Sequence, residues 1–124
     1  LYCLCVNTGS SSLKLALYRV DGDSAESCLW RGVAREIGTP AACIQRDGHC
    51  EKHWLPQHRT ALDILLRDPN LPRADAVGHR VVHGGEYIRP ERVTPGLLTR
   101  LHALVPLAPL HLPAALAGIA AVSE

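Results

Sequence analysis

The stretch that most constrains the fold of this 124-residue chain is LCVNTGSSSLKLALY, at residues 4–18. Two apolar runs flank a polar segment, which predicts a strand, a tight loop and a second strand. In the second run, Leu13, Leu15 and Leu17 alternate with other residues, which indicates a strand with one buried face. A simple hairpin would need only a two-residue Asn-Gly or Gly-Ser turn. Three consecutive serines after a glycine therefore indicate more than a turn.

The polar segment carries groups that could hold a phosphate. Gly9 permits a close approach of the backbone, and the hydroxyl and N–H groups of residues 10–12 can form an anion-binding nest. Lys14 adds a positive charge, and the amide oxygen of Asn7 is a hard ligand suited to Mg²⁺. The common P-loop, GxxxxGK[ST] leading into a helix, is absent. From composition alone, a polar hairpin with a solvated lysine is an equal alternative.

Composition and charge exclude several classes of protein. A hydrophobic content of 47% with 20% charged residues fits one globular domain with a core. The net charge of +1 is spread along the chain and indicates no nucleic-acid-binding patch. No apolar run approaches the roughly 20 residues needed to span a bilayer. Residues 1–6 lack the charged segment of a signal peptide, so we expect neither a nucleic-acid nor a membrane partner.

The five cysteines have irregular spacing. Cys50 and His53, with Cys43 and His49 nearby, could be drawn as a zinc site, but their spacing fits no standard zinc pattern. We therefore expect a reduced, cytosolic protein in which the cysteines act as small apolar residues.

The pattern of apolar residues predicts a mixed sheet with helices packed on it. The first 55 residues are mostly antiparallel strands, with turn signals at 21–24 and 46–49. The later residues show helical spacing and helix-capping signals. We expect strands at 1–8, 12–20, 28–37 and 75–83, a hairpin around 46–49, and helices at 61–66, at 95–105 after a Thr94 cap, and at 114–122. The first strand is apolar on both faces, which predicts a central place in a covered sheet.

A second polar motif is AVGHRVVHGGE, at residues 76–86. On a strand, Arg80 and Val82 would share one face, and His79 and His83 the other. The arginine fork can hold a carboxylate or phosphate while the valine contacts an alkyl group. We assign the ligand role to Arg80, because a buried arginine needs an anion. We assign His79 and His83 a structural role in fixing the loop.

A third motif is PLAPLHLP, at residues 106–113, where three prolines hold a rigid loop before a helix. His111 in that loop could donate a hydrogen bond to a phosphoryl oxygen and stabilise charge in a transition state. A capping or packing histidine is the alternative. The other four histidines have no comparable setting, and we expect them to be surface residues: His49, His53, His58 and His102.

Taken together, VNTGSSSLK, GHRVVHGGE and PLAPLH resemble, in order and spacing, the signatures of the acetate kinase family, a branch of the actin/sugar-kinase/Hsp70 superfamily. The resemblance covers essentially all 124 residues. It implies an α/β (α+β) fold: a ribonuclease H-like or actin-like ATPase lobe with a five-stranded mixed sheet and flanking helices. The family reaction that it implies is the reversible transfer of a phosphoryl group from ATP to acetate, which gives acetyl phosphate and ADP.

The resemblance also implies roles for individual residues at the nucleotide. Asn7 would contribute to the Mg²⁺ (or Mn²⁺) site that accompanies the co-substrate ATP. Ser10, Ser12 and Lys14 would face the phosphates of ATP.

On the substrate side, Arg80 would bind the carboxylate or acyl phosphate. Val82 and Leu110 would line the small pocket for the methyl group of acetate. His111 would steady the phosphoryl group during transfer.

This chain departs from the family pattern in two ways. Leu112 follows the loop histidine, where the family usually has asparagine, and leucine is a poor cap for a helix opened by Pro113. The chain is also short, because family members carry a second domain with the adenosine site, a catalytic aspartate and further catalytic groups. We therefore expect residues 1–124 to be an apparently truncated N-terminal domain, with the C-terminal domain absent and the isolated chain inactive.

Three other functions stay open. The parent could be a propionate or butyrate kinase, since one methylene is worth only about 1–3 kcal/mol in a pocket. The chain could be a non-catalytic lobe that binds phosphate or acyl phosphate, or a structural domain in which Arg80 pairs internally. The resemblance also implies a cytoplasmic enzyme, typically a homodimer through the other domain.

Overall fold

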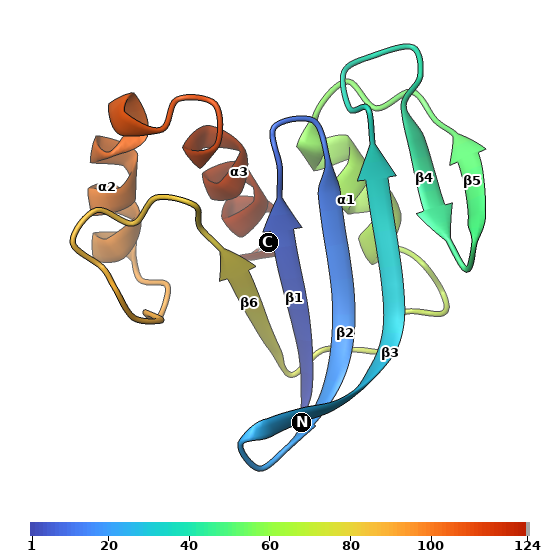
Figure 1. Ribbon diagram of the computed structural model, residues 1–124, viewed down its shortest axis with the longest axis horizontal. Helices are drawn as coiled ribbons and strands as arrows, with labels where there is room; N and C mark the ends of the chain where they lie inside the picture. The colour runs from blue at the N-terminus through green and yellow to red at the C-terminus, as the bar shows by residue number, and fades with distance from the viewer. Residues whose placement is uncertain (124) are drawn as a thin grey trace.

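The computed structural model describes residues 1–123, apart from the side chains of residues 24–26. Within this part of the chain, six strands form one sheet (Figure 1). The strands are β1 (Tyr2–Thr8), β2 (Leu13–Asp21), β3 (Ser24–Arg35), β4 (Cys43–Arg46), β5 (His49–Lys52) and β6 (Ala76–Arg80). The helices are α1 (His58–Leu66), α2 (Pro95–Ala103), the 3₁₀ helix η1 (Val105–Leu107) and α3 (Leu112–Ser123).

The sheet is mixed, as the sequence predicts. Its strand order is β5-β4-β3-β2-β1-β6, with antiparallel pairs everywhere except the parallel pair β1–β6. The predicted number of five strands is wrong by one. Both arms of the second hairpin extend the sheet, because β4 pairs with β3 and β5 pairs with β4.

Two tight turns explain why the first half of the chain pairs locally. Gly22 has a φ of 68°, and Asp47 and Gly48 have φ values of 47° and 78°. Positive φ at the central positions matches the turn to the twist of the flanking strands, which glycine and aspartate tolerate best. The first turn lets β3 begin at Ser24, four residues earlier than expected.

The last strand is shorter than predicted. β6 ends at Arg80 and does not extend to residue 83. Its only partner in the described part of the chain is β1, whose pairing with β6 ends at Asn7 opposite Arg80. Beyond that point the backbone has no strand to pair with, and Val82 therefore lies in a loop instead of on the strand face assigned to it.

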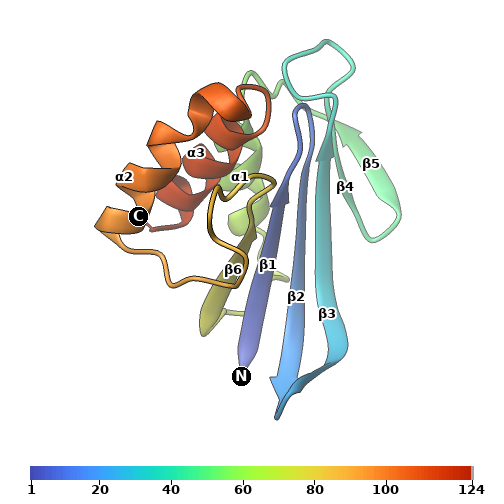
Figure 2. The same cartoon turned by 60° about the vertical axis from the view of Figure 1, so that its left-hand side comes forward.

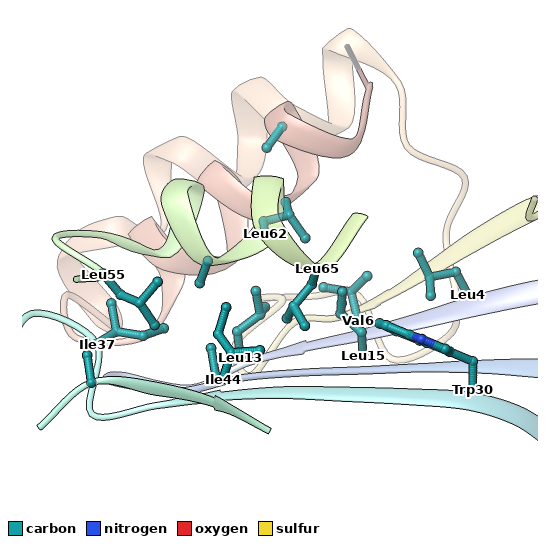
Figure 3. Close-up of a cluster of buried hydrophobic side chains, with 14 of the residues drawn as sticks. Leu4, Val6, Leu13, Leu15, Trp30, Ile37, Ile44, Leu55, Leu62 and Leu65 are labelled. Carbon is teal, nitrogen blue, oxygen red and sulfur yellow. The ribbon is translucent and has the colours of Figure 1, made fainter. Parts of the chain in front are cut away.

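All the helices lie on one side of the sheet (Figure 2). The main core forms between that side and helices α1 and α3. Alternate residues of β1 and β2 point into it, and α1 adds Ala61, Leu62 and Leu65 (Figure 3). The strand residues are Leu4, Val6, Leu13, Leu15 and Leu17.

Among the described residues, no helix lies on the opposite side of the sheet (Figure 2). Cys5 on that side of β1 is exposed, and Cys3 and Asn7 are half-buried. The prediction of a sheet covered on both faces is therefore wrong for this chain. Its apolar pattern was misleading because cysteine counts as apolar and yet lies here on the open face.

A second, smaller core joins α2 to α3. It contains Leu101, Leu112 and Leu116, with Val81 packed against it from the chain after β6. The predicted start of α2 is confirmed, because Thr94 Oγ1 accepts a hydrogen bond from Leu97 N at 3.1 Å and Pro95 opens the helix.

None of the described helices combines the length and apolar character required to cross a bilayer.

Candidate functional site

Three predicted site residues lie side by side on three neighbouring strands. Asn7 of β1 is opposite Lys14 of β2 and also opposite Arg80 of β6. Side chains directly opposite in a sheet point to the same face, with Cβ atoms about 5 Å apart. The row Lys14–Asn7–Arg80 therefore lies on the open face, next to the loops that follow β1 and β6. Strand pairing alone brings Arg80 next to Asn7, although the two residues lie far apart in the sequence.

The two cations of this row have no protein partner among the described residues. Asn7 is half-buried, whereas Lys14 and Arg80 are exposed. Within the described residues, neither Lys14 nor Arg80 forms a hydrogen bond or ion pair through its side chain. The internal pairing of Arg80 that a structural role would need is not formed. Two unpaired positive charges about an amide oxygen favour an anionic ligand.

The loop between β1 and β2 is held by its carbonyl groups. Gly9 N donates to Ser12 O at 2.9 Å, and Ile37 N donates to Ser11 O at 2.9 Å. The carbonyl oxygen of Gly9 lies 2.7 Å from Nε2 of His58. A Cβ atom at position 9 would lie 2.5 Å from Ser12 Oγ, so glycine leaves space for that hydroxyl.

The N–H groups of this loop are left available. Among the residues that the structure describes, the backbone N–H groups of residues 10–12 have no protein acceptor. Ser10 and Ser11 are exposed, and Ser12 is half-buried. Unpaired N–H groups and hydroxyls beside Lys14 are groups that can bind an anion such as phosphate.

The loop after β6 is fixed by local bonds, as predicted for His83. Its Nδ1 accepts from Gly85 N at 3.2 Å. Gly85 has a φ of 61°, and a Cβ there would lie 2.8 Å from Leu104 Cδ1, so the loop fits closely against the end of α2. Val82 stays exposed at 51%. His79 instead faces the helix side of the sheet, where loss of solvation lowers its pKa.

In the loop before α3, Leu110 and His111 differ in their exposure to solvent. Leu110 is exposed at 75%, and His111 is half-buried. The carbonyl of His111 accepts from Ala115 N at 3.2 Å, so His111 takes the helix-capping position. Leu112 is therefore the first helical residue and not the cap, and α3 begins two residues earlier than predicted.

Not all the predicted residues are brought together. Strand pairing places Asn7, Lys14 and Arg80 in one row, and the serine loop follows directly. No hydrogen bond or ion pair between described residues connects Val82, Leu110 or His111 to that row. Two hollows, of about 390 Å³ beside β3 and β4 and about 420 Å³ between α2 and α3, are not lined by Asn7, Lys14 or Arg80.

The cysteines do not form a metal site. All five are free thiols. The suggested zinc set is spread over the β4–β5 hairpin and the residue that follows it. Among residues 1–123, no group of three or more His, Cys, Asp or Glu side chains could hold a metal ion.

Sequence analysis missed His58. It was assigned to the surface, but it is half-buried and contacts the serine loop. Its position at the start of an amphipathic helix gave no sign of this contact, because the partner is a backbone oxygen 49 residues away.

Comparison with known proteins places this geometry in a family. Residues 2–124 match the family model described as the acetokinase family. The acetate kinase of Deinococcus radiodurans is 42% identical over 133 aligned residues, which cover 100% of this chain and 33% of that protein. The acetate kinase of Thermotoga maritima is 39% identical, with 98% of this chain and 33% of that protein covered.

Solved structures agree. The Porphyromonas gingivalis acetate kinase superposes with a TM-score of 0.85 and 29% identity, over 98% of this chain and 33% of that chain. A propionate kinase from Francisella tularensis gives a TM-score of 0.74 and 30% identity, over 97% and 33%. The chain thus spans about a third of the length of these relatives. By its sequence and by its actin-like fold, the chain belongs to the acetokinase family.

Proposed function

We propose that this chain is the phosphate- and carboxylate-binding lobe of an acetate kinase. The whole enzyme would transfer the γ-phosphoryl group of ATP reversibly to acetate, giving acetyl phosphate and ADP. The observation that carries the proposal is the row Lys14–Asn7–Arg80 beside a loop whose N–H groups are unpaired. Residues 1–124 would form the N-terminal domain.

The phosphates would lie on the β1–β2 loop. The N–H and hydroxyl groups of Ser10 and Ser12 can donate to phosphate oxygens, and Lys14 can neutralise their charge. In this position the protein lowers the barrier by fixing the phosphoryl group and balancing its charge, since phosphoryl transfer needs little covalent help.

Magnesium would be bound mainly through the nucleotide. Asn7 offers one amide oxygen next to two cations, and the described residues contain no group of three or more His, Cys, Asp or Glu side chains that could hold a metal ion. The described residues alone would therefore not surround the ion. One protein ligand does fit a magnesium ion that keeps waters and phosphate oxygens in its shell. When bound, the ion would neutralise charge that develops on the phosphate oxygens.

The carboxylate would bind to Arg80. Its guanidinium group can hold two oxygens of acetate or acetyl phosphate at once, and Val82 and Leu110 would contact the methyl group. Both side chains are exposed in this chain, so a ligand or a second domain could contact them. His111 would donate to the phosphoryl group in transfer.

A second domain would complete the site. The relatives are about three times as long as this chain, which supports a further domain with the adenosine site and the remaining catalytic groups. On the same family resemblance, the whole enzyme would be a cytoplasmic homodimer formed through that domain.

A propionate or butyrate kinase is the second candidate. The similarity to the Francisella propionate kinase favours it. The two acids differ from acetate by one and two methylene groups, so the walls at Val82 and Leu110 would decide the preference.

The proposal is tested first by binding. We would titrate acetyl phosphate into the 124-residue chain by calorimetry, with Arg80→Ala and with Arg73→Ala as the control. Arg73 is an exposed arginine in the loop before β6, at the far end of that strand. Loss of a charged hydrogen bond should weaken binding by Arg80→Ala about 10- to 100-fold, and Arg73→Ala should bind like the wild type.

Acyl-hydroxamate formation with Mg·ATP and acetate, propionate or butyrate measures turnover in parallel. Turnover that Arg80→Ala abolishes would mean that the chain completes its own site, and the preferred acid would name the kinase. Binding without turnover would leave a non-catalytic lobe whose chemistry needs the second domain. Binding that is absent, or equal in both variants, would contradict the proposal.

A further inference from the structure

His58 makes a contact that its place in the sequence does not suggest. It is the first residue of α1, and its Nε2 lies 2.7 Å from the carbonyl oxygen of Gly9. A carbonyl oxygen only accepts hydrogen bonds, so Nε2 carries the proton and donates. The start of α1 therefore lies directly behind the β1–β2 loop, as two views of the molecule agree (Figures 1 and 2).

The helix that carries His58 is firmly placed. Ala61 and Leu62, in its first turns, are 0% and 1% exposed, and Leu55 before it is 0% exposed. The segment is also bonded to the turn that follows β3, because Gly38 N donates to Leu55 O at 2.7 Å. The imidazole thus extends from a rigid element toward a loop that has no buried side chain of its own.

Three hydrogen bonds of the β1–β2 loop are accepted by backbone carbonyl oxygens. Gly9, Ser11 and Ser12 each have their carbonyl oxygen bonded to a protein N–H group. Of these, the Gly9 bond alone comes from a side chain. Because a trans peptide points its C=O and N–H groups in opposite directions, the Ser10 and Ser12 N–H groups point away from the partners of the Gly9 and Ser11 carbonyls. Among the described residues, the N–H groups of residues 10–12 have no protein acceptor. A set of donors fixed in advance binds an anion without a further ordering cost.

We infer that His58 is a positioning residue for the phosphate loop. Its hydrogen bond holds the Gly9 carbonyl so that the N–H groups of residues 10–12 point to the phosphates of the nucleotide. The inference rests on the proposed function for the identity of the ligand, but the effect on the loop itself does not depend on it.

Three variants separate positioning from packing. His58→Gln keeps an N–H donor at the end of a side chain of similar reach, His58→Leu fills space without a donor, and His58→Ala removes both. His49→Ala is the control, because His49 is an exposed histidine on the β4–β5 hairpin.

The first measurement is made without ligand. Hydrogen exchange of the Gly9 amide and ¹⁵N order parameters of residues 10–12 report the order of the loop. In His58→Leu and His58→Ala we expect faster exchange at Gly9 and lower order parameters, with core amides such as Leu15 unchanged. His58→Gln and His49→Ala should resemble the wild type.

The second measurement is the affinity for Mg·ATP by calorimetry. We expect His58→Leu and His58→Ala to bind about 3- to 10-fold more weakly, and His58→Gln to restore most of the loss. Loop order that is unchanged in His58→Leu would overturn the inference, and so would a loss of protection at Leu15 equal to that at Gly9. Equal ATP affinity in all four variants would overturn it as well.

The two proposals fail in different ways. A wild-type chain that binds neither Mg·ATP nor acetyl phosphate, while His58→Leu still loosens the loop, would count against the proposed function and support the positioning of the loop.

Discussion

At the residue scale, the buried carboxylate of Asp68 ties three parts of the chain together. Its Oδ2 accepts from Trp30 Nε1 at 3.1 Å and lies 3.4 Å from Arg46 Nη1. Its Oδ1 accepts from Asn70 N at 2.9 Å. The carboxylate thus links β3, the end of β4 and the turn after α1. These elements belong to the half of the sheet away from β1 and β6.

Replacing Asp68 by asparagine should destabilise the fold. The amide keeps only one of the two acceptor oxygens and loses the charge that faces Arg46, so we expect the free energy of unfolding to fall by about 1–3 kcal/mol at pH 7. Urea denaturation of the variant measures this loss. Asp63→Asn is the matched control, since Asp63 forms an exposed pair with Arg59 on α1 that should contribute less than about 1 kcal/mol.

The same contacts give the loss a pH dependence. The N–H of Asn70, with Trp30 and Arg46, lowers the pKa of Asp68 below its usual range, against the opposing effect of burial. A lowered pKa stabilises the fold above the unfolded-state value of about 3.9 and stops doing so as pH falls through the folded-state value. The difference between wild type and Asp68→Asn should therefore shrink below about pH 4. A constant difference from pH 7 to pH 3 would contradict this assignment.

At the element scale, Leu112 at the start of α3 packs into a core instead of capping the helix. Leu112 departs from the asparagine that the family resemblance leads one to expect, and as a helix cap it would be unfavourable. The structure gives the capping position to His111 and buries Leu112 to 1% exposure between α2 and α3. The leucine stabilises the second core in place of the cap.

Removing that side chain should weaken α3. We expect Leu112→Ala to lower the free energy of unfolding by about 2–5 kcal/mol. Leu112→Asn should cost at least as much, since it buries an amide in an apolar cluster. Thermal and urea denaturation measure both. Leu107→Ala, at a residue 64% exposed in η1, should change little. A Leu112→Asn variant as stable as wild type would contradict the assignment of Leu112 to the second core.

The elements themselves were largely predictable from sequence. Turn residues such as Gly22 and the Asp47-Gly48 pair, and the Thr94-Pro95 cap, act within a few positions of the backbone that they shape. The error at β6 arose because a distant partner decides the outcome: β6 ends where its pairing with β1 stops. The early start of α3 is a local effect, in which the His111 carbonyl accepts a hydrogen bond from Ala115 N.

At the scale of the whole molecule, the two cores differ in size. The larger one lies between the sheet and helices α1 and α3, and the smaller one joins α2 to α3 around Leu101. Helix α3 takes part in both, because Ala121 belongs to the first and Leu116 to the second. The α2 region therefore depends on fewer buried contacts than β2 does.

Native-state hydrogen exchange should reveal this difference. We expect the protection factors of amides in α2, such as that of Leu101, to be at least about tenfold lower than those of amides in β2, such as that of Leu15. The reason is that α2 can open without the sheet. Measurement at low denaturant separates local from global opening. Equal protection that follows global unfolding in both elements would contradict this expectation.

Some features of the candidate site could be predicted from the sequence, and others depend on the tertiary structure. By itself, the sequence determined the β1–β2 loop, the hairpin turns, the helix start at Thr94 and the residues that carry the family's signatures. Their signals are local, since turn geometry and strand alternation depend on neighbours within a few residues. Only the tertiary structure decided that Arg80 lies beside Asn7, that His58 holds Gly9 and that Leu112 is buried. The first two contacts join residues far apart in the chain, through strand pairing and through the packing of α1, and the burial of Leu112 depends on the packing of α2 against α3.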